Sequence, residues 1–307
     1  MRIAFASLKT SSPNMWLVTE NGAYMVADVC RSIGLEASPA SFTDPATFFQ
    51  EGLHRKLASV SPESTGVEPT SLSTLRLLPP VSKSSKIMCA AVNYRLHAAE
   101  TKGKIPSAPY FFLKPSSALT GPYDDLVKAK VSSKMDYEIE LVAIIGERAK
   151  YVDPARAIEH VGAYMVGNDV SYRDFQFSES HPDLLAHGKD WVLGKGMDTS
   201  FPTGPFAVTV DEIGHGPFDL ECRVNGTRVQ HSSTGDMIYD VSKLVARACT
   251  GVTLHPGDVI STGTPSGVAL GGGFRFLEPG DVVEGSISKI GSIRNRVVED
   301  TGLPVTS

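Results

Sequence analysis

The chain has 307 residues and a formal net charge of −5, with 41% hydrophobic and 21% charged residues, which is the composition of a globular protein. The acidic balance and the lack of a basic run interleaved with aromatic residues exclude a surface built for nucleic acid. No stretch approaches the ~20 consecutive apolar residues that span a membrane.

The N-terminal part of the chain predicts only a few short elements. Residues 1–7 are too short and weakly apolar for a secretory signal, so we expect a cytoplasmic protein. Strand-like pieces occur at Ile3–Phe5 and Met15–Val18, and a helix is predicted over Met25–Ile33. The stretch Ser61–Ser85 is rich in Ser, Pro and Thr, which is typical of a linker or an irregular covering segment. We therefore predict a small N-terminal domain and linker over 1–80 and a catalytic domain over 81–307.

Strand signals dominate from Lys86 onward. Short apolar, β-branched runs predict strands at Ile87–Val92, Tyr110–Leu113, Glu138–Ile145, Val161–Val166, Phe206–Val208, Leu220–Val224, Val259–Ser261 and Val282–Ile287. Helical patterns occur at Arg95–Lys102, Pro154–Ile158 and Met237–Ala248. Asn225-Gly226 is a strong signal for a two-residue hairpin turn. Because the strands lack a regular βαβ rhythm, we predict a β-rich α+β fold rather than a doubly wound sheet.

Two glutamates, Glu138 and Glu140, begin the most apolar of these strands. Side chains alternate between the faces of a strand, so both carboxylates point the same way, roughly 7 Å apart. Two like charges buried at that separation repel each other and also lose their hydration. A positive charge between them is therefore expected, and a divalent metal ion is the simplest candidate. The alternative is a solvated strand face, on which Glu-x-Glu is common.

A third carboxylate, Asp169, lies where the apolar pattern of the next strand ends. Three carboxylates without a thiolate or imidazole suit a hard cation, namely Mg²⁺, Mn²⁺ or Ca²⁺. We therefore predict a metal site formed by Glu138, Glu140 and Asp169.

His97 and Glu100 are three residues apart in a predicted helix and so share one face of it. A glutamate that accepts a hydrogen bond from one imidazole nitrogen raises the basicity of the other, which would make His97 a general base. The alternative is a surface pair without a role. Gly103 would allow this short helix to move as a lid.

Two glycine-rich segments add candidate residues. Lys195 lies between Gly194 and Gly196, where small neighbours would let a substrate approach the ammonium group; a solvated loop lysine is the alternative. The segment 261–267 is a Gly/Thr loop whose N–H groups and hydroxyls suit an anion. It lacks a P-loop lysine, which argues against a nucleotide site.

Taken in chain order, these segments resemble the fumarylacetoacetate hydrolase family from about Lys86 to Val298. The motifs that carry the resemblance are Asn93-Tyr94-Arg95 with His97 and Glu100, Phe112-Leu113-Lys114-Pro115-Ser116, Tyr137-Glu138-Ile139-Glu140-Leu141, Asn168-Asp169-Val170-Ser171 with Arg173 and Gln176, Gly194-Lys195 with Asp198-Thr199, Val224-Asn225-Gly226, and Gly257-Asp258-Val259-Ile260 with Gly263-Thr264-Pro265-Ser266-Gly267.

The resemblance implies a mixed β-roll, a homodimer, and Mg²⁺, Mn²⁺ or Ca²⁺ as the cofactor. It implies metal ligands at Glu138, Glu140 and Asp169, a basic pair at His97 and Glu100, and an electrophilic lysine at Lys195. Positions expected to bind substrate are Arg95, Lys114, Arg173, Gln176 and Thr264. The stretch 177–190, with His181 and His187, looks longer than is usual in the family and is expected to line the pocket, although both histidines are expected to be surface residues.

The sequence therefore predicts a metal-dependent hydrolase that cleaves a carbon–carbon bond in a 1,3-diketo, acylpyruvate-like acid. The expected partner is thus a small dicarbonyl or 2-oxo acid, with no nucleic acid and no membrane. Decarboxylation, tautomerisation or hydration of a 2-oxo acid would use the same enolate and stay open as alternatives. A non-catalytic binding protein is a further alternative, which the His97/Glu100 pair and Lys195 argue against because binding alone needs no base.

Overall fold

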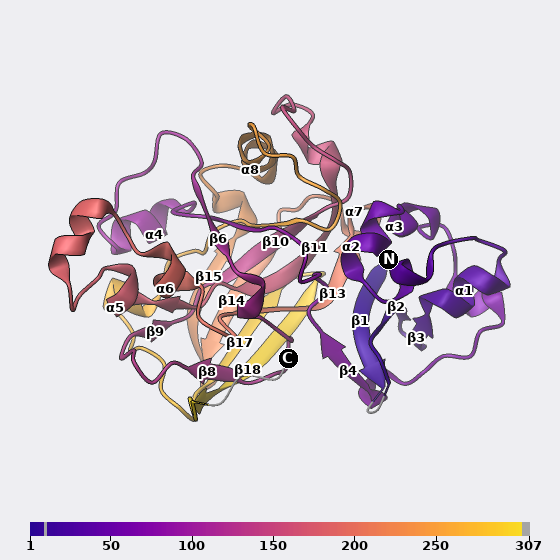
Figure 1. Ribbon diagram of the computed structural model, residues 1–307, viewed down its shortest axis with the longest axis horizontal. Helices are drawn as coiled ribbons and strands as arrows, with labels where there is room; N and C mark the ends of the chain where they lie inside the picture. The colour runs from indigo at the N-terminus through magenta and orange to yellow at the C-terminus, as the bar shows by residue number, and fades with distance from the viewer. Residues whose placement is uncertain (9–10, 303–307) are drawn as a thin grey trace.

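The structure, a computed structural model, describes residues 1–8 and 11–302. In Figure 1 the N-terminal elements, coloured indigo, form the right-hand side of the molecule, and α4, α5 and α6 lie at its left-hand side. The helices are short, with bounds α1 Val26–Ser32, α2 Pro45–Gln50, α3 Leu53–Lys56, α4 Arg95–Glu100, α5 Arg173–Gln176, α6 Trp191–Lys195, α7 Val210–Ile213 and α8 Val241–Ala248. Within the described residues, no helix combines the length and apolar character needed to cross a bilayer.

Most strands belong to two sheets. The larger one is mixed and has the order β3-β2-β1-β13-β11-β10-β16-β5-β6, with β4 paired to β1 and β7 to β13. Its strands are β1 Arg2–Leu8, β2 Asn14–Thr19, β3 Gly22–Met25, β4 Leu75–Leu78, β5 Ile87–Ala90, β6 Phe111–Lys114, β7 Leu119–Thr120, β10 Ile139–Ile145, β11 Val161–Asn168, β13 Phe201–Thr209 and β16 Val259–Ser261.

The second sheet has the order β15-β14-β17-β18-β8, and β12 pairs with β9 separately. These strands are β8 Leu126–Lys128, β9 Met135–Asp136, β12 Ser171–Tyr172, β14 Asp219–Val224, β15 Thr227–Ser233, β17 Val282–Ile287 and β18 Gly291–Glu299. Side chains of both sheets meet in one hydrophobic core, to which β10 contributes Ile139, Leu141 and Ala143. The architecture is thus the expected β-rich α+β fold with a mixed β-roll.

Alternation along β10 decides which of its side chains reach the functional site. Ile139 and Leu141 face the core between the two sheets, whereas Val142 and Ile144 belong to a different apolar cluster on the opposite face. Glu138 and Glu140 have the same parity as Val142 and therefore share its face. The alternation of side chains along β10 therefore sets the direction of both carboxylates.

The N-terminal strands continue the large sheet. Strand β1 pairs with β2 on one side and, through Arg2 opposite Val208 and Ile3 opposite Ala207, with β13 on the other. The second apolar cluster contains residues from both parts of the chain, among them Phe48 and Val142. The division of the chain near residue 80 stays a prediction.

Most predicted elements occur with bounds shifted by a few residues, and two predicted helices were partly wrong. Residues 154–156 form a turn, in which Asp153 Oδ1 accepts from Ala155 N, and only a 3₁₀ turn at Ala157–His160 follows. Residues 237–239 are not helical, because Asp240 caps α8 by accepting from Lys243 N and so fixes its start at Val241. Strand β4 lies within the stretch predicted to be irregular.

Candidate active site

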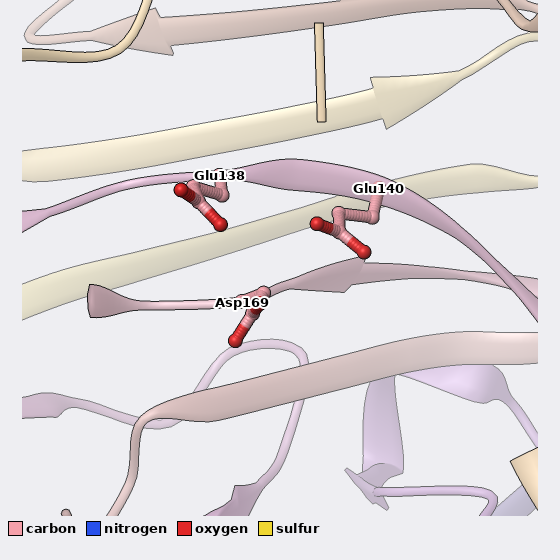
Figure 2. A group of neighbouring side chains, drawn as sticks. All are labelled: Glu138, Glu140 and Asp169. Carbon is pink, nitrogen blue, oxygen red and sulfur yellow. The ribbon is translucent and has the colours of Figure 1, made fainter. Parts of the chain in front are cut away.

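Three buried carboxylates meet where β10 begins and β11 ends. The antiparallel register sets Ile139 opposite Asn168, so Glu138 and Asp169 are neighbours, and Asp169 N donates to Glu138 O at 2.8 Å. Figure 2 shows Glu138 and Glu140 on one strand and Asp169 on the adjacent one. One oxygen from each of the three side chains lies within 4.8 Å of the others. The predicted ligand set is therefore brought together.

Two of these carboxylates are paired with buried cations. The Lys195 ammonium contacts Glu138 Oε2 at 2.5 Å and Asp169 Oδ2 at 2.7 Å. Arg173 Nη2 contacts Glu138 Oε1 at 2.5 Å, and Lys114 Nζ contacts Asp169 Oδ1 at 2.7 Å. These contacts fix the rotamers of both acids and offset part of their desolvation.

Among the residues described by the structure, none forms an ion pair with Glu140. Its Oε2 accepts from Ser261 Oγ at 2.5 Å and from Gly263 N at 2.9 Å, and both donors are neutral. Burial and the nearby charges of Asp169 and Glu138 raise the pKa of Glu140 well above its ordinary value. A divalent cation bound among the three acids would remove this imbalance, and an all-carboxylate donor set suits a hard ion. The residues thus fit a divalent metal.

The charge states of the paired groups follow from the same contacts. Burial disfavours the charged form of Lys195, but Asp169 and Glu138 outweigh it, and the pKa of Lys195 is raised. Burial likewise opposes ionisation of Glu138, yet Lys195 and Arg173 hold its pKa below the ordinary value. Lys195 is therefore a charged donor and not a base at neutral pH.

His97 and Glu100 form a hydrogen-bonded pair on α4. His97 Nδ1 lies 2.9 Å from Glu100 Oε1, and Glu100 Oε2 accepts from Gly267 N at 2.8 Å. Because an ionised carboxylate only accepts, Nδ1 is the donor in this bond, and in the neutral imidazole Nε2 is then the nitrogen with the lone pair. His97 is buried and lines the same cavity as the three acids. The imidazole of His97 and the three acids thus share one cavity.

A hydrogen-bond clamp fixes the loop that follows β16. Gln230, on β15, donates through Nε2 to Thr264 Oγ1 at 2.9 Å and to Pro265 O at 2.9 Å, and its Oε1 accepts from Ile139 N at 3.1 Å. Thr264 Oγ1 in turn donates to Ile139 O at 2.9 Å. One amide therefore ties the anion-binding loop to the strand that carries the glutamates.

The cavity has a volume of about 300 Å³. Its lining includes His97, Lys195, Arg173, Gln176 and Thr264, together with the three acids. Gln176 Oε1 accepts from Arg173 Nη1 at 3.0 Å. The Arg173 guanidinium therefore has three side-chain partners, namely Glu138, Gln176 and Asp136.

Two of the residues expected to bind substrate lie elsewhere. Lys114 is buried behind Asp169, where it also donates to the carbonyl oxygens of Val170 and Lys195, and it does not line the cavity. Arg95 is exposed on α4 and does not line the cavity either. In this structure Lys114 contacts the Asp169 carboxylate, and Arg95 is exposed outside the cavity lining.

Sequence reasoning missed several residues that organise the site. Asp136 accepts from Arg173 Nε at 2.9 Å and from Ala269 N at 2.9 Å. It has the same parity as Glu138 and Glu140, so the alternation of the strand was a signal that could have found it. Gln230 comes from the other sheet, and no local signal links it to Thr264. Within 177–190, Lys189 lines the cavity, whereas His181 and His187 are exposed, as expected.

A mixed β-roll that holds three converging carboxylates beside a histidine–glutamate pair is the architecture of a metal-dependent enzyme. Residues 86–298 match the family described as fumarylacetoacetate (FAA) hydrolase C-terminal. The chain belongs to the fumarylacetoacetate hydrolase family.

Known relatives catalyse more than one reaction. The chain is 35% identical to the mitochondrial oxaloacetate tautomerase FAHD2B of Bos taurus over 302 residues, covering 96% of this chain and 91% of the relative. It is 37% identical to 2,4-didehydro-3-deoxy-L-rhamnonate hydrolase of Sphingomonas sp. (strain SKA58) over 270 residues, covering 83% and 92%. The relatives thus include hydrolases and tautomerases of oxo acids.

A solved structure of similar fold bears on the metal. Fumarylpyruvate hydrolase from Pseudomonas aeruginosa in complex with Mn²⁺ and pyruvate superimposes with a TM-score of 0.64 at 30% identity, covering 73% of this chain and 92% of that one. That complex, the family match and the buried acid cluster support a metal-dependent enzyme of the family. The expected homodimer and the cytoplasmic location stay predictions.

Proposed function

We propose that the protein is a divalent-metal hydrolase that cleaves a carbon–carbon bond in an acylpyruvate-like 1,3-diketo acid. The observation that carries this proposal is that His97, paired with Glu100, lines the same cavity as Glu138, Glu140 and Asp169. A site that only binds its ligand needs no oriented base. Mg²⁺ or Mn²⁺ is the expected ion, with Ca²⁺ as the third candidate.

When bound by the three acids, such a cation would polarise a carbonyl group and stabilise negative charge on an enolate oxygen. Lys195 adds a fixed positive charge beside Glu138 and Asp169. Because it is held by two carboxylates, it does not reorganise when charge develops on a substrate, which is what electrostatic stabilisation requires. We assign it the role of the electrophilic donor.

His97 is the proposed base. Its Nε2 faces the cavity with a free lone pair, and Glu100 stabilises the imidazolium that forms when a water molecule gives up a proton. The hydroxide attacks the carbonyl carbon, the bond to the adjacent carbon breaks, and the electron pair leaves as the enolate of the 2-oxo acid. The proton on His97 then returns to that enolate carbon.

The Thr264 loop would bind the substrate mainly through backbone N–H groups, because the Thr264 hydroxyl already donates its proton within the protein. The hydroxyl proton is used by Ile139 O, so Thr264 Oγ1 offers a substrate only an acceptor. A substrate carboxylate would instead be bound by N–H groups of this loop, and Gln176 adds an amide to the lining of the cavity.

The second candidate is tautomerisation of a 2-oxo diacid, which needs proton transfer but no water. The specific observation in its favour is the similarity to the oxaloacetate tautomerase of Bos taurus, which extends over 96% of this chain. Decarboxylation would pass through the same enolate but has no comparable support.

The test is a set of assays on the protein loaded with Mn²⁺ or Mg²⁺. Acylpyruvates are followed by the release of two carboxylic acids, and oxaloacetate by the change in ultraviolet absorption of its enol and by CO₂. We expect acid release as the fastest reaction. Fast enol–keto conversion without acid release would favour the second candidate, and no turnover with any substrate would overturn the proposal.

Glu140→Gln is the matched control for the metal. Glutamine has the same shape as glutamate but carries no charge, so the fold should survive. Mn²⁺ should then no longer raise the unfolding temperature. If Mn²⁺ stabilised Glu140→Gln as much as it stabilises the unmodified protein, the ion would not bind at these acids.

A further inference from the structure

Lys189 is a lysine in the lining of the active-site cavity. Its ammonium lies 4.9 Å from the ring centroid of Phe177 and 5.2 Å from that of Trp191, so aromatic faces hold it in place. Among the residues that the structure describes, no carboxylate forms an ion pair with it. Lys189 nevertheless lines the cavity.

The charges nearest to Lys189 have the same sign as its own. Partial burial lowers its pKa, and the positive charges of Arg173 and Lys195 lower it further, with only Glu138 acting in the other direction. An ammonium placed this way is stabilised by any anion that enters the cavity, because the anion offsets both the like-charge repulsion and the desolvation.

The lining of the cavity carries both signs of charge. Its acids are Glu138, Glu140 and Asp169, which lie together in the metal site. Lys189 lines the same cavity, and apolar side chains such as Val92, Phe112 and Leu270 line it as well. The cavity therefore offers a substrate one more cation besides the groups at the metal site.

We propose that Lys189 binds a second carboxylate of the substrate, so that the enzyme prefers 2-oxo acids with a second acidic group. This proposal rests on the proposed function, since it takes the 2-oxo acid end to lie at the three acids. The second carboxylate of such a diacid would then pair with the Lys189 ammonium. A charge-assisted hydrogen bond of this kind changes affinity by roughly ten-fold.

The test compares two ligands of equal chain length in the presence of Mn²⁺. 2-Oxoglutarate has the second carboxylate and 2-oxopentanoate lacks it. The chain has two tryptophans, of which Trp191 lines the cavity and Trp16 is buried in β2, so quenching of tryptophan fluorescence reports binding. The variants are Lys189→Met, Lys189→Arg and, as a control, Lys104→Met, whose lysine is exposed and does not line the cavity.

We expect the unmodified protein to bind 2-oxoglutarate about ten-fold more tightly than 2-oxopentanoate. Lys189→Met should reduce this preference to about three-fold or less, whereas Lys189→Arg and Lys104→Met should keep it. Equal affinity for the two ligands, or an unchanged preference in Lys189→Met, would overturn the role of Lys189 and leave the proposed function intact. If neither ligand bound, the proposed function itself would be wrong, and the assignment of Lys189 would fall with it.

Discussion

The His97 imidazole differs from Lys195 and Arg173 because it has no hydrogen bond to any of the three acids. Its hydrogen bond is to Glu100, on its own helix. His97→Ala should therefore lower kcat by about 10²- to 10⁴-fold, the range typical of a lost general base, and leave the affinity for Mn²⁺ unchanged. Steady-state kinetics and an equilibrium titration with Mn²⁺ measure the two effects separately.

Leu96→Ala is a suitable control for that variant, since Leu96 is the neighbouring residue on α4 and 70% exposed. It should leave both quantities unchanged. A loss of Mn²⁺ affinity in His97→Ala that matched the loss of turnover would show that His97 acts on the metal and not on the substrate.

Gln230 is expected to act through Thr264. Gln230→Met keeps the volume but removes three hydrogen bonds and leaves the buried Ile139 N–H unpaired, which should cost about 1–3 kcal/mol of folding stability. Loosening of the Thr264 loop should also raise KM. The measurement is a double-mutant cycle with Thr264→Val, monitored by KM for the best substrate. Additive effects of the two substitutions would contradict the coupling.

At the scale of residues, the sequence could predict what local periodicity encodes. Glu138, Glu140 and Asp169 were recognisable because each interrupts an apolar strand at its end. The partners that hold them were not, since Lys114, Arg173 and Ser261 reach the acids only through tertiary contacts. Lys189 lies in a stretch without periodicity, and its role depends on Trp191 and Phe177 beside it.

At the scale of elements, burial on both faces made the central strands easy to predict. All residues of β10 and β11 are buried, and apart from Glu140 and Asn168 near their ends both strands appear in the sequence as apolar runs. Strand β18 alternates buried and exposed residues and contains Arg294 and Arg296. Because of these polar residues, it was not predicted as a strand. The predicted helices at 154–158 and 237–248 were partly wrong because a turn at Asp153 and the helix cap at Asp240 determine the local structure there.

Helix α3 brings a neutral histidine to the end of β10. His54 is 3% exposed, its Nδ1 has no hydrogen-bond partner, and its ring lies 4.9 Å from that of Phe49. Gly146 and Gly162 leave the space that the ring fills, since a Cβ on Gly146 would lie 2.9 Å from His54 Nε2. Burial, helped by Arg55, lowers the pKa of His54 to about 4.

The sign of the resulting pH dependence follows from linkage. The unfolded chain binds a proton at the ordinary pKa near 6.5 and the folded protein only near 4, so protons favour unfolding. Stability from His54 is complete above about pH 6.5 and is lost as the pH falls toward 4, by up to about 3 kcal/mol in total.

His54→Leu should remove this contribution. Chemical denaturation at pH 7 and at pH 5 should give a smaller difference in the free energy of unfolding for His54→Leu than for the unmodified protein. His231→Gln, which changes an exposed histidine, should retain the full difference. The same pH dependence in His54→Leu and the unmodified protein would mean that other groups cause the acid sensitivity.

At the scale of the whole molecule, the N-terminal part and the roll share a sheet and a core. Neither the pairing of β1 with β13 nor the shared cluster could be predicted from sequence, because the paired residues lie about 200 positions apart and have no local signal. The cluster joins Met15, Phe49 and Leu53 to Val142 and Ile144. Val142 and Ile144 lie on the face of β10 that also carries Glu138 and Glu140. The N-terminal part therefore packs against the same strand face as the predicted metal ligands.

Residues 1–80 should therefore unfold together with the rest of the chain. Differential scanning calorimetry of the full chain should show a single transition with equal calorimetric and van't Hoff enthalpies. A chain that begins at residue 81 should lose the cover over Val142 and Ile144 and expose the edge of β13, which favours aggregation. It should bind a hydrophobic dye and gain no thermal stability from Mn²⁺. Two separate transitions, or a shortened chain that Mn²⁺ still stabilises, would instead establish residues 81–307 as an independent folding unit, and the acids of β10 would then need no support from the N-terminal strands.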